Sequence, residues 1–336
     1  MKWDVLIIGQ GIAGTLLSFL LMEQGKKVLI LDEMNVNSCS RIATALLNPV
    51  TGKRLRIDDA YSFAKGPAEQ IYQRLSVWLN TPILSYHPTI RLFADIEQQN
   101  DWMVKMQDDL YSSFFQSKKP EWDIHPSILA PHGACHQNPI SRVLSHTLLF
   151  QFRQKGLQEG FIQEKKIDFS ALQIDSSGVQ YEEHSALKIV FCTGWTREQI
   201  PYFPDLTFQP ALGQLLYIEA TEIPEDTIIM GPAVITPTGQ PHQFAVGSIY
   251  DWKTTTAHPT PENRDILIKQ LQKTICCPYA ITGEAAAVRP TTPSRLPILL
   301  RHAGGLPAFC FNGLGTKGYS WGPAYAEQCT KEWIDA

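Results

Sequence analysis

The first thirty-three residues carry two short apolar runs separated by a stretch of helical periodicity. Residues 4–9, DVLIIG, are rich in leucine and β-branched residues and end at glycine, and residues 15–25, TLLSFLLMEQG, place four leucines at helical spacing. A second apolar run, KKVLILDE, follows at 26–33. This pattern predicts a strand, a helix and a strand, and a right-handed crossover makes the two strands parallel neighbours.

Periodicity also predicts the elements of the rest of the chain. Helices are expected over 64–80, 138–156 (capped by Asn138-Pro139) and 260–275, with a last helix from Pro323. Strands are expected over 161–173, 178–183 and from 186 to an end at Thr193-Gly194. Between 207 and 255 the apolar pieces are broken by proline and glycine, which indicates a run of strands and not more βαβ units.

This order of elements predicts the fold class. We expect an α/β fold, α+β overall, in which a Rossmann-type FAD/NAD(P)-binding domain carries an inserted substrate domain built on a largely antiparallel sheet. The nucleotide-binding domain is expected to comprise residues 1–52, 135–206 and 284–336. The substrate-binding domain would then comprise 53–134 and 207–283.

Composition narrows the classes of protein. The chain has 336 residues, 44% of them hydrophobic and 18% charged, which is typical of a folded globular protein. A net charge of −4 provides no field for a polyanion, so a nucleic-acid partner is not expected. No apolar run reaches membrane-spanning length and the N-terminus lacks a signal pattern, so we expect no membrane partner and a cytoplasmic location. The seven cysteines include no C-x-x-C motif; reduced thiols and no metal site are expected.

A glycine motif lies between the first strand and the first helix. Gly9, Gly11 and Gly14 form G-x-G-x-x-G, which permits a tight turn and a close approach of the backbone to a pyrophosphate at the helix N-terminus. Asp32 ends the second strand, where an acid accepts hydrogen bonds from ribose hydroxyls, and Glu33 is the competing acid. A carboxylate there disfavours NADP, and the motif leaves NAD and FAD open.

A second motif, Gly318-Tyr319-Ser320-Trp321-Gly322, spells the G-x-S-x-G of hydrolases. A nucleophile elbow needs an acid and then a histidine after the serine, but the last histidine of the chain is His302. The order therefore argues against a hydrolase. The glycines before Ser320, with a helix after them, favour a turn whose backbone N–H groups point at an acceptor.

Arg289 lies in AAAVRPTTP, after small apolar residues and before a proline. A charge in such a place is paired or faces a cavity. A planar guanidinium suits bidentate capture of a substrate carboxylate. A structural salt bridge to Glu284 or another acid is the alternative.

Several longer stretches occur in an order that is more specific than any one of them. They are VLIIGQGIAG, SRIATALLNPVTGKR, NPISRVLSHTLLFQFRQKG, IVFCTGWT, PALGQLLYIE, VGSIYDW, and VRPTTPSRLPIL followed by NGLGTKGYSWGPAYAEQ. With these the chain resembles, nearly end to end, the D-amino-acid oxidase-like family of FAD-dependent amine oxidoreductases, which includes glycine oxidase and sarcosine oxidase.

The resemblance implies a cofactor site. The glycine motif and Asp32 would bind the ADP part of FAD, residues 43–47 would lie along the flavin, and the backbone of 313–319 would face the pyrimidine end of its ring. No cysteine in AAAVRPT matches the covalent attachment of the sarcosine oxidases, so FAD is expected to be non-covalent. The expected cofactor-binding residues are Gly9, Gly11, Ile12, Ala13, Gly14, Asp32, Glu33, Arg41, Ala43, Thr44, Ala45, Leu46, Leu47, Thr193, Gly194, Trp195, Gly313, Leu314, Gly315, Thr316, Lys317, Gly318 and Tyr319.

The resemblance also implies a reaction. The CH–NH bond of a small amino acid or N-substituted amine would be oxidised by hydride transfer to flavin N5, with O2 or another electron acceptor. Arg289 falls where glycine oxidase holds the substrate carboxylate, and Lys317 falls where some relatives carry arginine; both are the expected catalytic residues. No side-chain base is expected. Val234 replaces an aromatic substrate contact.

Three alternatives stay open at the level of sequence. GTKGYSWGPAYAEQ and AVRPTTPSRLP also resemble the oxidase half of the bifunctional enzyme that modifies wobble uridine in tRNA. A tRNA substrate is ranked second, because this chain has no methyltransferase half and no excess of basic residues. The others are a flavin-binding protein without turnover and a NAD dehydrogenase.

Overall fold

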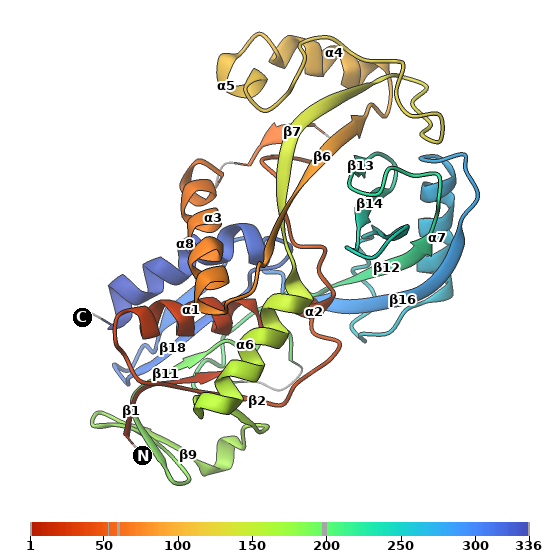
Figure 1. Ribbon diagram of the computed structural model, residues 1–336. Helices are drawn as coiled ribbons and strands as arrows, with labels where there is room; N and C mark the ends of the chain where they lie inside the picture. Colours follow the sequence, from red (N-terminus) through yellow and green to blue (C-terminus); the bar gives the residue numbers. More distant parts are fainter. Residues whose placement is uncertain (1, 53, 59–60, 197–199, 335–336) are drawn as a thin grey trace.

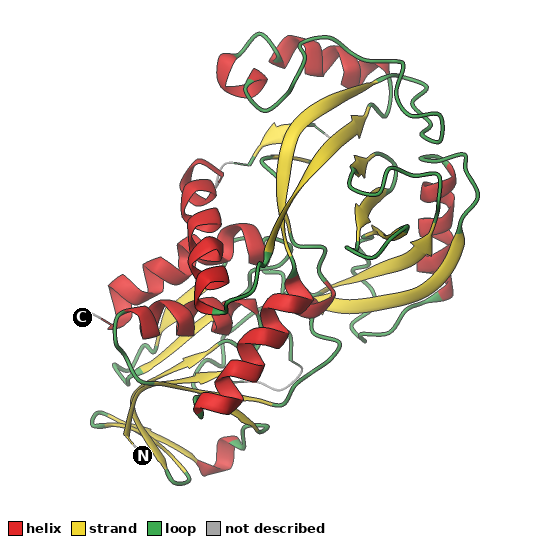
Figure 2. Cartoon of the chain, in the orientation of Figure 1, coloured by secondary structure: helices red, strands yellow, loops and turns green. Residues whose placement is uncertain are grey.

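Two large sheets dominate the fold. A computed structural model describes residues 2–52, 54–58, 61–196 and 200–334. In Figure 1 the first sheet lies under a layer of helices that includes α1 (Ile12–Glu23), α6 (Ser145–Glu159) and α8 (Gly318–Cys329), and the second sheet lies beyond that layer. Figure 2 shows that the second sheet is covered less completely by helices than the first.

The first sheet has the strand order β17-β18-β11-β1-β2-β8, and β10 and β9 continue from β11. The strands are β1 (Lys2–Ile8), β2 (Val28–Asp32), β8 (Ile162–Glu164), β9 (Leu172–Asp175), β10 (Gly178–Tyr181), β11 (His184–Phe191), β17 (Ile298–Arg301) and β18 (Ala308–Asn312). β1 and β2 run parallel, with Val5 opposite Val28, so the predicted βαβ unit is confirmed.

The central strands are apolar throughout because both faces of this sheet are covered. Successive side chains of a strand point to opposite faces. Val5 and Ile7 pack in the core under the helices, whereas Leu6 and Ile8 pack in a second core with β9 and β10. Burial on both sides explains why residues 4–9 show a continuous apolar run instead of alternation.

The second sheet has the order β16-β12-β15-β14-β13-β6-β7-β3. It is antiparallel except where β13 runs parallel to β6. Its strands are β3 (Leu46–Leu47), β6 (Leu84–Leu92), β7 (Ala134–Val143), β12 (Ala211–Glu219), β13 (Ile228–Met230), β14 (Val234–Pro237), β15 (Gln243–Gly247) and β16 (Ala280–Arg289). These two sheets, one mainly parallel and one largely antiparallel, agree with the predicted fold class.

The remaining elements complete the two layers. They are α2 (Cys39–Ile42), α3 (Tyr61–Trp78), α4 (Ile96–Lys105), α5 (Asp109–Ser112), α7 (Pro261–Gln272), the short strands β4 (Val50–Thr51) and β5 (Arg56–Ile57), the 3-10 helix η1 (Phe169–Ala171) and the π-helix η2 (Thr330–Ile334). The second sheet buries Leu267 and Leu271 of α7, and Trp102 of α4 centres a separate core. Among the helices that are described, none has both the length and the apolarity to cross a bilayer.

Three predicted elements were wrong in their bounds. The helix expected over 138–156 starts only at Ser145, because residues up to Val143 belong to β7 and pair with β6. Ile140 and Val143 lie three positions apart, and both a helix and an irregular strand can bury two side chains at this spacing. The pairing of β7 with β6 makes this segment a strand. The strand expected over 161–173 stops at Glu164, and η1 precedes the next one.

The last helix begins at Gly318 and not at Pro323, which lies inside it. Glycines depress the helical pattern of the first turn, and a proline inside a helix removes one backbone hydrogen bond. Contacts of α8 with α1 and α3 compensate for the glycines and for the missing hydrogen bond.

The expected domain borders stay a prediction. β7 and all of β16 lie in the second sheet, although residues 135–143 and 284–289 were assigned to the nucleotide-binding domain. We propose that the borders follow the sheets and fall after Val143 and after Arg289.

Candidate active site

The glycine turn between β1 and α1 is close-packed. Gly9 has a φ of +103°, and a Cβ there would lie 2.5 Å from the carbonyl oxygen of Cys192. A Cβ on Gly14 would lie 2.0 Å from the carbonyl oxygen of Gly9. Only glycine fits at either place, so α1 can begin directly against the strand and leave its N-terminus accessible for an anion.

Asp32 ends β2 beside this turn, and a buried arginine holds it there. Arg153 on α6 is 1% exposed, and its Nη1 lies 2.7 Å from Asp32 Oδ1, while its Nε lies 2.9 Å from Glu164. The backbone N–H of Gln10 donates to the other oxygen of Asp32 at 2.8 Å. The carboxylate is thus fixed from two sides at the sheet edge where a ribose is bound in dinucleotide folds.

An elongated hollow, here named the outer cavity, opens at this edge. Arg41 lines this cavity. Burial lowers the pKa of its guanidinium and the charge of Asp32 raises it, and an arginine stays cationic well above neutral pH. A cation and a helix N-terminus together suit a pyrophosphate. Of the expected cofactor-binding residues, Gly9, Gly11, Asp32, Glu33, Arg41, Thr193, Gly194 and Trp195 line the outer cavity.

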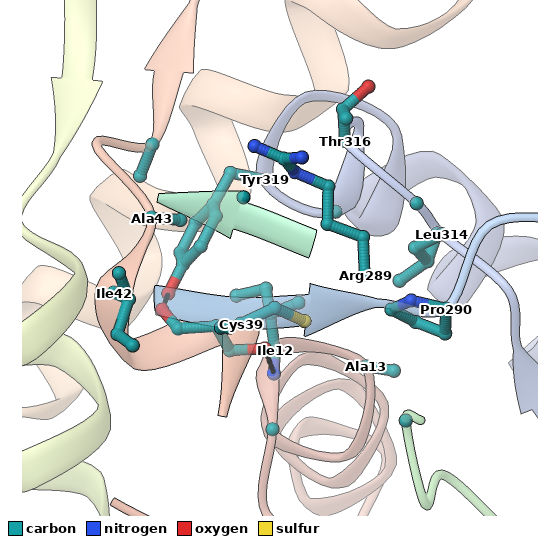
Figure 3. A pocket seen from close by; sticks show the side chains of 18 of the residues that line it. Ile12, Ala13, Cys39, Ile42, Ala43, Arg289, Pro290, Leu314, Thr316 and Tyr319 are labelled. Carbon is teal, nitrogen blue, oxygen red and sulfur yellow. Dashed lines mark hydrogen bonds between the residues drawn. The ribbon is translucent and has the colours of Figure 1, made fainter. Parts of the chain in front are cut away.

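A second hollow, the inner cavity, continues toward the second sheet. Gly11, Cys39, Ser40, Cys192 and Gly194 line both cavities, so the two adjoin, and together they are named the joined cavities. Figure 3 shows the inner cavity between α1, the loop before α8 and β16. Of the expected residues, Gly11, Ile12, Ala13, Ala43, Thr44, Ala45, Leu46, Gly194, Arg289, Leu314, Gly315, Thr316, Gly318 and Tyr319 line the inner cavity.

Arg289 extends into the inner cavity from the end of β16 (Figure 3). Its Nη1 donates to the carbonyl oxygens of Ile249, at 3.2 Å, and Leu212, at 3.4 Å, and its Nη2 donates to Ser248 Oγ. The guanidinium carbon lies 4.6 Å from the centre of the Tyr250 ring. No acidic residue in the described part of the chain forms an ion pair with it.

The alternative partner of Arg289 is engaged elsewhere. Glu284 forms an ion pair with Arg264 and accepts a hydrogen bond from Gln214 at 2.9 Å. Gly213 on β12 makes room for the guanidinium, since a Cβ there would lie 2.2 Å from Arg289 Nη2. Burial lowers the pKa of Arg289, but an arginine stays cationic well above neutral pH. The inner cavity therefore contains the positive charge of Arg289, and no side chain that the structure describes neutralises it.

The start of α8 is held by two tyrosines. Pro323 has no N–H to donate to the carbonyl of Tyr319 four residues earlier, and Tyr72 Oη on α3 donates to that carbonyl at 2.8 Å instead. Tyr319 Oη donates to the carbonyl of Ser40 at 2.6 Å. Burial raises the pKa of both tyrosines, which keeps these hydroxyls protonated as donors. These two hydrogen bonds fix the expected backbone turn before Ser320 against α2 and α3.

Four expected site residues line neither cavity. Gly14 packs against Gly9, Leu47 lies in the core under the helices, and a Cβ on Gly313 would lie 2.8 Å from the Thr292 methyl group. Lys317 Nζ lies 2.5 Å from Asp58 Oδ2, and the Asp58 side chain is 8% exposed. The structure therefore gives Lys317 a partner outside the cavity it was expected to serve.

The sequence reasoning missed several residues that position the site. Ser248 and Tyr250, which contact Arg289, lie in VGSIYDW. This stretch contributed to the resemblance, but none of its residues was predicted to belong to the site. Asn312 ends β18, and its amide donates to Thr193 Oγ1 at 3.2 Å and to the Gly194 carbonyl at 3.0 Å. A polar residue at a buried strand end was the signal that could have identified Asn312.

Comparison with known proteins identifies the family. The family model described as FAD dependent oxidoreductase matches residues 4–332. The chain belongs to this family. The predicted resemblance is confirmed, and this FAD-dependent oxidoreductase is therefore an enzyme and not a NAD dehydrogenase.

The fold of this oxidoreductase is shared by solved structures of low sequence identity. Glycine oxidase from Bacillus cereus ATCC 14579 is similar with a TM-score of 0.79 at 18% identity, over 99% of this chain and 97% of that one. Iminodiacetate oxidase from Chelativorans sp. BNC1 gives 0.76 at 16%, over 99% and 95%. L-alpha-glycerophosphate oxidase from Mycoplasma pneumoniae, with FAD bound, gives 0.73 at 12%, over 100% and 95%.

The cavities of this oxidoreductase fit FAD. The outer cavity combines the α1 N-terminus, a cation and a fixed carboxylate, which suit the pyrophosphate and ribose of the ADP part. The inner cavity adjoins it and is lined by residues 43–46 and by residues 314–316, 318 and 319. The residues of the two linings therefore suit a dinucleotide with a flat ring at one end.

Proposed function

We propose that this enzyme oxidises the CH–NH bond of a small amino acid or N-substituted amine, with FAD bound non-covalently across the joined cavities. Arg289 supports this proposal above all. It is the cation of the inner cavity and has only neutral acceptors around it, so a substrate carboxylate would complete its charge.

FAD supplies the hydride-accepting chemistry, and the protein positions the substrate. The Arg289 guanidinium would hold the carboxylate in a planar fork, which fixes the adjoining carbon inside the inner cavity. Ser248 Oγ and the Ile249 carbonyl would hold the guanidinium itself. The carboxylate is thereby anchored at one end while the amine stays free to react.

The proposal needs no side-chain base. None of the described residues that line the inner cavity is an aspartate, glutamate, histidine or lysine. Tyr319 is occupied as a hydrogen-bond donor, and its pKa is raised by burial. The amine would therefore arrive unprotonated, and the pH dependence of the reaction would follow the pKa of the substrate amine.

Anaerobic mixing of the FAD-loaded enzyme with a panel of amino acids and N-substituted glycines tests this function. Loss of the flavin absorbance on mixing with an amine is the expected result. The panel should include the matching alcohols, such as glycerol 3-phosphate and 2-hydroxy acids. Bleaching by an alcohol and by none of the amines would overturn the proposal.

A further inference from the structure

A third hollow, the side cavity, lies between β6, β13 and the segment that leads into α4. Its volume is about 1090 Å³. Five cations and three acids are found among the described residues that line it, whereas the whole chain has a net charge of −4. The cations are Arg54, Arg56, Arg91, Lys105 and Lys273, and the acids are Asp95, Glu97 and Asp101. The site of the proposed reaction does not use this cavity.

Arg91 is the buried member of this set. It lies on β6 and is 7% exposed. Its Nη2 donates to the Val50 carbonyl at 2.7 Å, and contacts Met230 Sδ at 3.2 Å and Gln137 Oε1 at 3.4 Å. Its Nε is buried without any acceptor. All these contacts are neutral, and no acid of the described chain pairs with Arg91, an unusual state for a buried charge.

The other cations surround the entrance to the same space. Arg54 and Arg56 are exposed, and Lys105 Nζ donates to the carbonyl of Arg54. Burial lowers the pKa of Lys105, the charge of Asp101 raises it, and the charges of Arg56 and Arg54 lower it, so the three cations lie close enough to repel one another. Asp95 caps α4 by accepting from the Gln98 N–H at 2.7 Å, and the three acids of the lining leave it an excess of two cations.

The side cavity adjoins the inner cavity. Leu46 lines both of them. It packs in a small aliphatic cluster with Met230 and Val234, which line the side cavity, and with Ile140 and Ile228. Aliphatic side chains thus lie where the two cavities adjoin.

We propose that the side cavity binds a second anionic group, a carboxylate or a phosphate, at the distal end of the amine substrate, with Arg91 as its principal ligand. This inference rests on the proposed function, since the second anionic group would belong to the same substrate whose first carboxylate binds Arg289. The substrate class would then be an elongated amine with an acid at each end. An aliphatic portion would pass along Leu46 and Val234.

Direct binding tests the side cavity without turnover. Inorganic phosphate is titrated calorimetrically into the FAD-loaded enzyme, and the variant Arg54→Ala/Arg56→Ala is compared with Lys118→Ala/Lys119→Ala, which removes two exposed cations outside the cavity. Loss of two charge contacts is expected to weaken phosphate binding about tenfold in the first variant only. Equal binding by both variants, or no binding by the unmodified enzyme, would overturn the inference.

Kinetics test the link to the substrate. N-methylglycine is compared with N-carboxyalkylglycines of increasing chain length, and the ratio of their kcat/KM values is measured. One chain length is expected to be preferred, and Arg91→Met should reduce that preference about tenfold, with part of it kept by Arg91→Lys. Preference for no chain length, or the same preference in Arg91→Met with its flavin retained, would contradict the inference. Bleaching by no amine at all would refute the proposed function, while the phosphate titration would still report on the cavity.

Discussion

Among single residues, three arginines with low exposure have different partners. Arg153 is paired with Asp32 and Glu164, whereas Arg289 and Arg91 contact only neutral acceptors in the described chain. A buried cation that remains unpaired is costly unless a ligand completes it. The local sequence distinguishes none of the three, because each partner comes from a distant segment.

Arg289→Ala is expected to weaken binding of amines that carry a carboxylate and to leave the flavin content unchanged. Loss of a charge-assisted hydrogen-bond pair corresponds to about 1.5–3 kcal/mol, or roughly a tenfold to hundredfold rise in Kd. Reductive titration under anaerobic conditions measures this Kd. An amine without a carboxylate is the control and should be affected much less. Loss of flavin in the variant would instead indicate a structural role for Arg289.

Gly14→Ala is expected to abolish FAD binding and to lower the free energy of unfolding by about 1–3 kcal/mol, as overpacking does. The new Cβ would lie 2.0 Å from the Gly9 carbonyl oxygen and push α1 away from β1. Gly283→Ala is the matched control, because its Cβ would lie 3.6 Å from the nearest atom of Tyr217. Flavin absorbance per protein and urea unfolding measure both effects, and retention of flavin by Gly14→Ala would contradict the expected role.

Among the elements, α8 shows how a helix can contain a local defect. Its first five residues include Gly318 and Gly322, and Pro323 removes a hydrogen bond inside the helix. Both glycines are covered closely, since a Cβ on Gly318 would lie 3.1 Å from Ile12 and one on Gly322 would lie 3.0 Å from Leu16. The helix starts early because α1 and α3 pack against this turn.

Tyr72→Phe is expected to destabilise the protein by about 1–3 kcal/mol, because the buried carbonyl of Tyr319 loses its donor. The same change in a Pro323→Ala background should cost less, since the substituted alanine has the backbone N–H that can donate to this carbonyl. A double-mutant cycle by urea unfolding measures the difference. An equal cost in both backgrounds would show that the tyrosine hydroxyl does not replace the missing bond.

Across the whole molecule, the joined cavities connect the two sheets. The outer cavity is lined mainly by the first sheet and its loops, whereas Gly213 and Leu215 of β12 and Arg289 of β16 bring the second sheet to the inner cavity. FAD bound across both cavities would therefore contact both sheets. ADP would occupy only the outer cavity.

FAD is expected to slow amide hydrogen exchange in residues 211–219, and ADP at equal saturation is expected to slow exchange in α1 and β2 without this effect. A ligand stabilises the elements it contacts against local opening, and β12 lines the inner cavity. Hydrogen exchange followed by mass spectrometry measures this. The same protection of 211–219 by both ligands would contradict the assignment of the two cavities.

The βαβ unit and the glycine turn with Asp32 could be predicted from the sequence, because these depend on short-range periodicity and on residues close together in the chain. The family could be predicted as well, because it shows in the order of several stretches along the whole chain. The first turn of α8, the strand up to Val143 and the partners of the arginines could not. They depend on tertiary contacts, since Tyr72 donates a hydrogen bond to α8, β6 pairs with β7, and Asp58 forms an ion pair with Lys317, which is distant in the sequence. Whether a charge is paired depends on which segments meet, and a local pattern carries no record of that.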